Sequence, residues 1–86
     1  MHIELAPEVM FQNLGGESIL LDMQKGYYYG LDEVGTQFWS LLAAGHDVDS
    51  AVAALLEVFE VDEATLRSDL DALLLELQTA GLVAVC

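Results

Sequence analysis

The side chains that could do covalent or metal chemistry are few in this sequence. His2 and His46 are 44 positions apart, and neither belongs to a group of ligands with metal-binding spacing. Cys86 is the single cysteine, so it cannot form an internal disulfide, and no neighbouring residue is of a type that would activate its thiol. Gly15-Gly16 is not followed by the Gly-Lys-Ser/Thr of a phosphate-binding loop. We therefore expect no catalytic residue, no metal site, no cofactor and no enzymatic activity.

Carboxylates are abundant, but their spacing places them on water-facing surfaces. Fifteen Asp and Glu stand against only Lys25 and Arg67, which gives a formal net charge of −13. On the helix predicted near residues 63–79, Asp69 and Glu76 lie off the leucine stripe, as solvated residues do. A charge of this size repels nucleic acids and anionic membranes, and it favours cationic partners.

The elements that must position any site follow from a change of hydrophobic periodicity near residue 32. Before it, apolar residues alternate with period two, which predicts strands near 8–13, 17–23 and 27–31. After it, the period is 3.6, which predicts helices near 33–44, 49–59 and 63–79. We predict one α+β domain over residues 1–86, similar to a winged helix-turn-helix, with a three-stranded antiparallel sheet followed by three helices.

Aspartates mark the expected helix starts. Asp32 and Asp62 are N-cap candidates for the first and third helices, and either Asp47 or Asp49 caps the second. The residues from Leu82 onward are either a short final strand or a tail.

Three consecutive tyrosines occupy the third predicted strand. Successive side chains of a strand point to opposite faces, so they cannot all be buried on one side. If Tyr27, Tyr29 and Leu31 point into the core, Tyr28 points outward, whereas the opposite phase exposes two tyrosines. Tyrosine also simply suits strands, and that explanation stays open.

The third strand and the third helix together predict a groove. A three-stranded sheet has two edges, and we expect the aromatic strand to be one of them. The third helix carries an apolar stripe that would lie beside it. An extended peptide can add to such an edge by main-chain pairing while its side chains enter pockets, and acidic residues on the rim would favour Lys or Arg in the peptide. The stripe consists of Leu66, Leu70, Leu73, Leu74 and Leu77.

Neither a signal peptide nor a membrane-spanning segment is expected. Met1 to Pro7 lack a basic region followed by an apolar run, and no run approaches the roughly 18 apolar residues of a membrane helix. Together with a single cysteine, this predicts a cytoplasmic protein.

The sequence contains the segments Ile19-Leu20-Leu21-Asp22, Lys25-Gly26-Tyr27-Tyr28-Tyr29-Gly30-Leu31-Asp32, Val34-Gly35 and Phe38-Trp39 with Leu41-Leu42, and it closes with the pattern Leu66, Asp69-Leu70, Leu73-Leu74, Leu77 and Gly81-Leu82. Together these segments resemble the PqqD-like family, whose members are recognition elements for ribosomally made, modified peptides. The resemblance runs from about Val9 to Val85 and implies a leader-peptide groove between the third strand and the third helix. Carried over by position, the peptide-binding residues would be Tyr27, Tyr28, Tyr29, Leu31, Leu66, Asp69, Leu70, Leu73 and Leu74.

Within that family, the chain is most similar to the discrete leader-binding proteins of lasso-peptide biosynthesis. The resemblance implies a non-catalytic protein that binds the leader region of a precursor peptide. It would present that peptide to a cysteine leader peptidase, after which a cyclase closes the ring.

Three other functions are compatible with parts of the sequence. The first is a PqqD-type peptide chaperone for a radical enzyme of quinone cofactor synthesis, but the Pro-Glu-Gly turn of that protein is replaced here by Gln24-Lys25-Gly26. The second is a winged-helix transcription regulator, which the single basic residue of the third helix, Arg67, disfavours. The third is a small structural subunit whose groove another protein fills permanently.

Overall fold

The computed structural model describes residues 2–85, so Met1 and Cys86, with its thiol, lie outside the described residues. The elements in chain order are β1 (Ile3–Leu5), β2 (Val9–Asn13), β3 (Ser18–Asp22), β4 (Tyr27–Leu31), α1 (Glu33–Ala43), α2 (Val48–Val58), α3 (Glu63–Thr79) and β5 (Val83–Val85).

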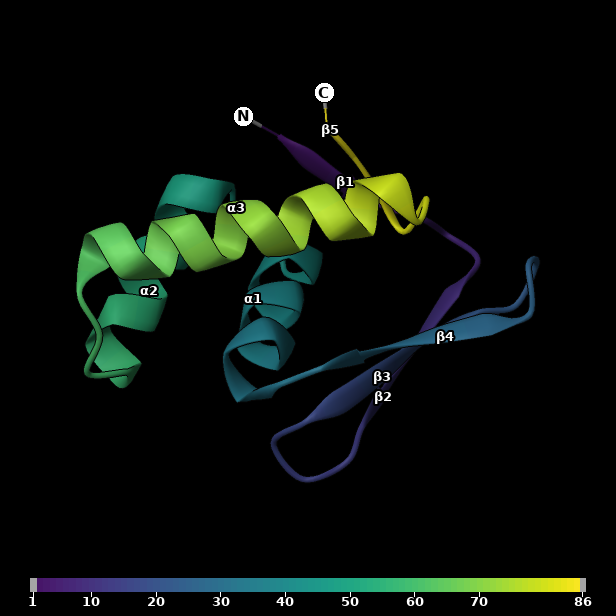
Figure 1. The fold of residues 1–86 in the computed structure, drawn as a ribbon, viewed down its shortest axis with the longest axis horizontal. Helices are drawn as coiled ribbons and strands as arrows, with labels where there is room; N and C mark the ends of the chain where they lie inside the picture. Colours follow the sequence, from purple (N-terminus) through teal and green to yellow (C-terminus); the bar gives the residue numbers. More distant parts are fainter. Residues whose placement is uncertain (1, 86) are drawn as a thin grey trace.

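Strands β2, β3 and β4 form an antiparallel sheet in that order, so β4 is an edge strand, and the three helices follow it (Figure 1). The predicted α+β fold class is therefore confirmed. The observed strands and helices of this part agree with the predicted ranges to within one residue at each end. In Figure 1, α3 runs from beside α2, past α1, toward the strands, and the β3–β4 hairpin extends beyond its end.

The β3–β4 turn forms because its residues satisfy each other's hydrogen bonds. The buried carboxylate of Asp22 accepts hydrogen bonds from the backbone N–H groups of Gln24 (2.9 Å) and Lys25 (3.0 Å). Gly26 then adopts a φ of 74°, which lies in the left-handed region that glycine enters without steric cost. This turn fixes the register in which Leu20 lies opposite Tyr29.

Aspartate side chains begin all three helices. Asp32, Asp47 and Asp62 accept hydrogen bonds from backbone N–H groups three residues later, which satisfies donors that a helix start leaves free. Asp47 is therefore the cap of α2. Asp49 instead forms a salt bridge of 3.0 Å with Arg67 of α3.

The core lies between the inner face of the sheet and the apolar stripes of the helices. Trp39, which lies away from the centre of the α1 stripe, is also buried. Removing this apolar surface from water is the main stabilising contribution to the fold. The largest fully buried side chains are Phe38, Leu20, Leu55, Leu66, Leu70, Leu77, Leu82 and Val52.

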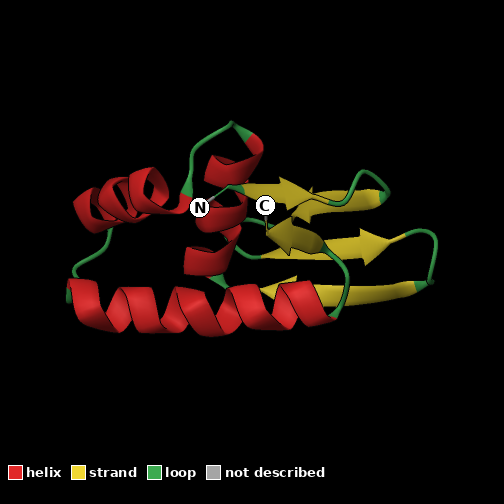
Figure 2. Cartoon of the chain, turned by 90° about the horizontal axis from the view of Figure 1, so that it is seen from above, coloured by secondary structure: helices red, strands yellow, loops and turns green. Residues whose placement is uncertain are grey.

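The terminal segments pair with each other as a second, two-stranded sheet. Ile3 lies opposite Val85 and Leu5 opposite Val83, and Figure 2 shows the two short strands side by side. A strand at Ile3–Leu5 was not predicted, because three residues carry no readable periodicity and the partner is some eighty positions away. Since β5 pairs with β1, the end of the described chain does not cover the free edge of β4.

Candidate functional site

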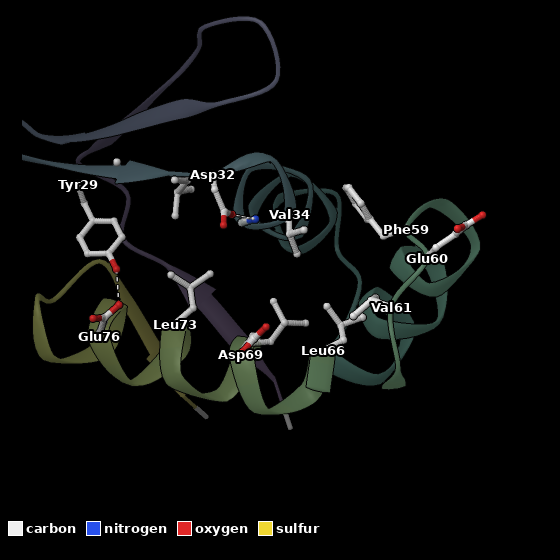
Figure 3. Close-up of a pocket in the computed structure, with 14 residues that line it drawn as sticks. Tyr29, Asp32, Val34, Phe59, Glu60, Val61, Leu66, Asp69, Leu73 and Glu76 are labelled. Atoms are coloured by element: carbon white, nitrogen blue, oxygen red, sulfur yellow. Dashed lines mark hydrogen bonds between the residues drawn. The ribbon is translucent and has the colours of Figure 1, made fainter. Parts of the chain in front are cut away.

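A groove of about 530 Å³ lies between β4 and α3 (Figure 3). It is formed by β4 and the start of α1 on one side, by α3 on the other, and by the α2–α3 connection at one end. The lining residues are Tyr29, Gly30, Leu31, Asp32, Val34, Gly35, Phe59, Glu60, Val61, Leu66, Asp69, Leu70, Leu73 and Glu76.

The β4 side of the groove combines an apolar surface with free backbone groups. Among the described residues, β4 pairs with β3 on one side only. Alternate residues of an edge strand direct N–H and C=O groups away from the sheet, where another strand can pair with them. Leu31 is buried and Tyr29 is half-buried, so the groove below this edge is apolar.

The α3 side presents one face of the helix to the groove. Leu66, Leu70 and Leu73 recur at helical spacing, and Asp69 and Glu76 lie on the flanks of the same face. Leu66 and Leu70 are 2% exposed and belong to the core, whereas Leu73 is half-buried and accessible to a ligand. The face therefore offers an apolar floor with carboxylates beside it.

The end of the groove away from Tyr29 is closed by side chains from other elements. Phe59 and Val61 come from the α2–α3 connection, and Val34 comes from the first turn of α1. Gly35 lets the start of α1 lie close to the end of β4, because a Cβ there would lie 3.2 Å from Oδ1 of Asp32 and 3.3 Å from Cδ2 of Leu31. This end is a mainly apolar recess.

Every charged residue that lines the groove is acidic. Asp32 is occupied as the α1 cap, and Glu76 accepts a hydrogen bond of 2.5 Å from the Tyr29 hydroxyl. This bond, followed by partial burial of the ring and the negative charges of Glu76 and Asp32, raises the pKa of Tyr29 to about 12. The carboxylates of Glu60 and Asp69 accept no hydrogen bond from the described residues and stay available to a cationic ligand.

A family model described as "Coenzyme PQQ synthesis protein D (PqqD)" matches residues 17–83, which is well over half of the chain. The chain belongs to the PqqD family. This confirms the family resemblance drawn from the sequence, and the matched range includes both β4 and α3.

Solved structures similar to this PqqD-family chain include two proteins bound to leader peptides. TbiB1, solved in complex with the TbiA(beta) leader peptide, is 32% identical; the match covers 96% of both chains and has a TM-score of 0.89. A lasso peptide synthetase B1, solved in complex with the leader peptide, is 24% identical; the match covers 99% of this chain and 100% of that one, with a TM-score of 0.86, and shows the shared fold. No curated protein matched the chain.

The structure brings together six of the nine residues predicted for the site of this PqqD-family chain. Tyr29 and Leu31 line the groove from β4, and Leu66, Asp69, Leu70 and Leu73 line it from α3. The other three, Tyr27, Tyr28 and Leu74, do not line it.

Those three residues have separate environments. The Tyr27 hydroxyl donates a hydrogen bond to the carbonyl oxygen of Ala80, just beyond α3. Leu74 is buried in the core. Tyr28 is 71% exposed and lies on the opposite face of the sheet, beside Met10 and Leu21. Of the two strand phases left open by the sequence, the structure has the one with Tyr28 outward.

Eight groove residues were missing from the predicted site. The sequence predicts Glu76 on the solvated flank of the helix, and the contact that reveals its place in the groove is the hydrogen bond from Tyr29. Phe59 is the last residue of the helix predicted near 49–59, and Glu60 and Val61 follow it in the α2–α3 connection, so the periodicity of the sequence does not link them to the groove. The other four lie in the segments that resemble the family, but the resemblance does not show whether a residue contacts the ligand or shapes the local backbone. They are Gly30, Asp32, Val34 and Gly35.

The part of the chain that the structure describes contains no cluster of side chains that could hold a metal ion. Within residues 2–85, no three His, Cys, Asp or Glu side chains converge as metal ligands. No helix of these residues is long and apolar enough to span a membrane.

Proposed function

We propose that this PqqD-family chain is a non-catalytic protein that binds the leader segment of a ribosomally made precursor peptide in lasso-peptide biosynthesis. The observation that carries the proposal is the free edge of β4 beside the apolar groove to α3. The leader would add to β4 as a fourth strand. The complexes of TbiB1 and of lasso peptide synthetase B1 with leader peptides support this function.

The chemistry of the groove suits an extended peptide better than a small molecule. Main-chain hydrogen bonds to β4 provide affinity that does not depend on peptide sequence. Every second peptide side chain would then face α3, where Leu73 and the apolar recess select by shape and hydrophobicity. Binding to a preformed groove also avoids much of the entropy cost of ordering the protein.

The acidic residues of the groove favour a leader that carries Lys or Arg. Glu60 and Asp69 line the groove, and their carboxylates accept no hydrogen bond from the described residues. The whole chain also has a net charge of −13. This field would accelerate the approach of a basic peptide and weaken as salt is added.

The bound leader would then be presented to separate enzymes. The resemblance implies a cysteine leader peptidase and, after it, a cyclase. A binding protein without catalytic residues suits this role, because it can hold the leader while the rest of the precursor reaches the enzymes. We place this step in the cytoplasm, where a newly made ribosomal peptide is available.

The second candidate function is a peptide chaperone for a radical enzyme of quinone cofactor synthesis. The observation that favours it is the family description, which names coenzyme PQQ synthesis. It uses the same groove, so the two candidates differ in the peptide that binds and in the enzyme that follows.

Fluorescence anisotropy with labelled peptides tests the function and separates the candidates. We expect the leader of a lasso precursor encoded beside this chain to bind with micromolar or tighter affinity. The precursor peptide of quinone cofactor synthesis should bind at least about tenfold more weakly, a difference of about 1.4 kcal/mol. The reverse preference favours the chaperone, and absence of binding to either peptide contradicts strand addition as the function of the groove.

A further inference from the structure

Within residues 2–85, hydrogen bonds bridge the groove between β4 and α3 at one end only. Among the described residues, the hydrogen bonds that join β4 to α3 and its C-cap start from Tyr27 and Tyr29. Their partners, Ala80 and Glu76, both lie at the C-terminal end of the helix. Figure 3 shows the Tyr29 ring reaching across to Glu76, while Leu66 and Leu73 face the open part of the groove.

The tip of the β3–β4 hairpin lies at the same end. A Cβ added to Gly81 would lie 2.9 Å from Nζ of Lys25, so this ammonium group approaches the end of α3. A cation there is favourable, because the C-terminal end of a helix carries a partial negative charge. Sheet and helix are therefore held together at this end, whereas no hydrogen bond among the described residues joins β4 to α3 near the recess of Phe59 and Val61.

Glu76 occupies a position that general helix rules disfavour. It is a carboxylate in the last turn of α3, a turn that contains no basic residue. A negative charge there interacts unfavourably with the helix dipole. Departures of this kind concentrate at functional positions, and the contact that Glu76 makes is the bond from Tyr29.

From this geometry we infer that Tyr29 and Glu76 are a positioning pair, which sets the width of the groove and holds it ready for a strand beside β4. The inference rests on the proposed function. A fourth strand would lie in the plane of the sheet, whereas the Tyr29 ring projects from its inner face toward α3, so peptide and bridge can coexist.

The bridge is expected to affect binding more than folding. It is accessible to water in the free chain, since Glu76 is exposed and Tyr29 is half-buried. A hydrogen bond in that setting contributes little to stability. A peptide that covers the bridge removes this water and strengthens the bond, so the gain appears in the peptide affinity.

A double-mutant cycle on leader affinity tests the pair. Tyr29→Phe and Glu76→Ala should each weaken binding about threefold, and the double variant should be no weaker than either one, because both remove the same bond. Melting temperatures should change little. Tyr28→Phe is the matched control, since it removes the same hydroxyl from the outer face of β4 and should not alter affinity. Additive losses, or no loss, overturn the inference.

Glu76→Gln separates the bond from the charge. Glutamine keeps an oxygen that accepts from Tyr29, so it should restore most of the affinity that Glu76→Ala loses. A loss as large as that of Glu76→Ala would mean that the carboxylate acts through its charge on the peptide, which overturns the inference.

Carbon-13 NMR of the Tyr29 ring tests the bridge without any peptide. The pKa of Tyr29 should be about 12 in the unaltered chain and should return toward the ordinary value of 10 in Glu76→Ala. Because the folded-state pKa is raised, the contribution of the bridge is complete below pH 10 and is lost as the pH rises through 12. An ordinary Tyr29 pKa in the unaltered chain overturns the inference even if the peptide binds, whereas a failure of the peptide alone overturns the proposed function.

Discussion

The two faces of β4 show how neighbouring residues of one type come to differ. Tyr29 lies on the inner face, reaches α3 and lines the groove, whereas Tyr28 lies on the outer face and is 71% exposed. The outer face of the sheet has its own shallow apolar hollow, formed by Met10, Gln12, Ile19, Leu21 and Tyr28. Aromatic character alone therefore does not define this site, because α3 packs beside the inner face of the sheet and, within the described residues, the outer face has no helix next to Tyr28.

Helix α3 also has two different faces, and substitutions on them should give the largest difference, which is in the free energy of unfolding. Leu70 is 2% exposed beneath the groove, whereas Leu75 is 65% exposed on the far side of the helix. Leu70→Ala should lower the free energy of unfolding by about 2–5 kcal/mol through the cavity it leaves. Leu75→Ala should change it by less than about 0.5 kcal/mol. Chemical denaturation measures both, and equal losses would contradict the observed packing.

A charge placed on the groove face of α3 should strongly weaken peptide binding without unfolding the chain. Leu73→Glu puts a carboxylate on the half-buried apolar floor, so leader affinity should fall at least about tenfold. Leu75→Glu adds the same charge to the far side and should bind almost normally. Anisotropy gives the affinities, and circular dichroism checks the fold. A similar loss in both variants would assign the effect to net charge instead of the groove.

Removing a single groove carboxylate should have a modest effect. Asp69→Asn should weaken binding of a basic leader about two- to threefold and reduce its salt dependence, since exposed charge interactions are small and screened. Asp71→Asn is matched in charge on the same helix but does not line the groove. Affinities measured across a salt series should separate the two variants. If they respond alike, the acidic residues act only through the overall field.

The smallest effect is expected on the outer face. Tyr28→Ala removes an exposed aromatic ring from β4 but leaves the groove intact, so leader affinity should change by less than about twofold. A large loss by anisotropy, in a variant that still folds, would place the peptide on the outer face and reverse the comparison.

Much of this fold could be predicted from the sequence because its signals are local. The strand alternation, the Gly26 turn, the aspartate caps and the leucine stripe of α3 each act within a few residues. The edge position of β4 followed from the number of strands and its aromatic character.

What could not be predicted depends on contacts between distant residues. Three adjacent tyrosines do not alternate with polar residues, so the sequence does not show which of them face the core. The face of the sheet on which Tyr28 lies could therefore not be predicted. Phe59 lines the groove because the α2–α3 connection lies beside the start of α1. Glu76 lines it because α3 lies beside Tyr29 of β4, which is 47 positions earlier in the sequence. The β1–β5 pair has too few residues to show a pattern.

Amide hydrogen exchange with and without the leader peptide tests strand addition most directly. The account predicts that outward-facing N–H groups of β4, within Tyr27–Leu31, become protected when peptide is added, while the opposite sheet edge, β2 at Val9–Asn13, exchanges as before. Protection confined to β2, or peptide binding that leaves β4 unprotected, would contradict it.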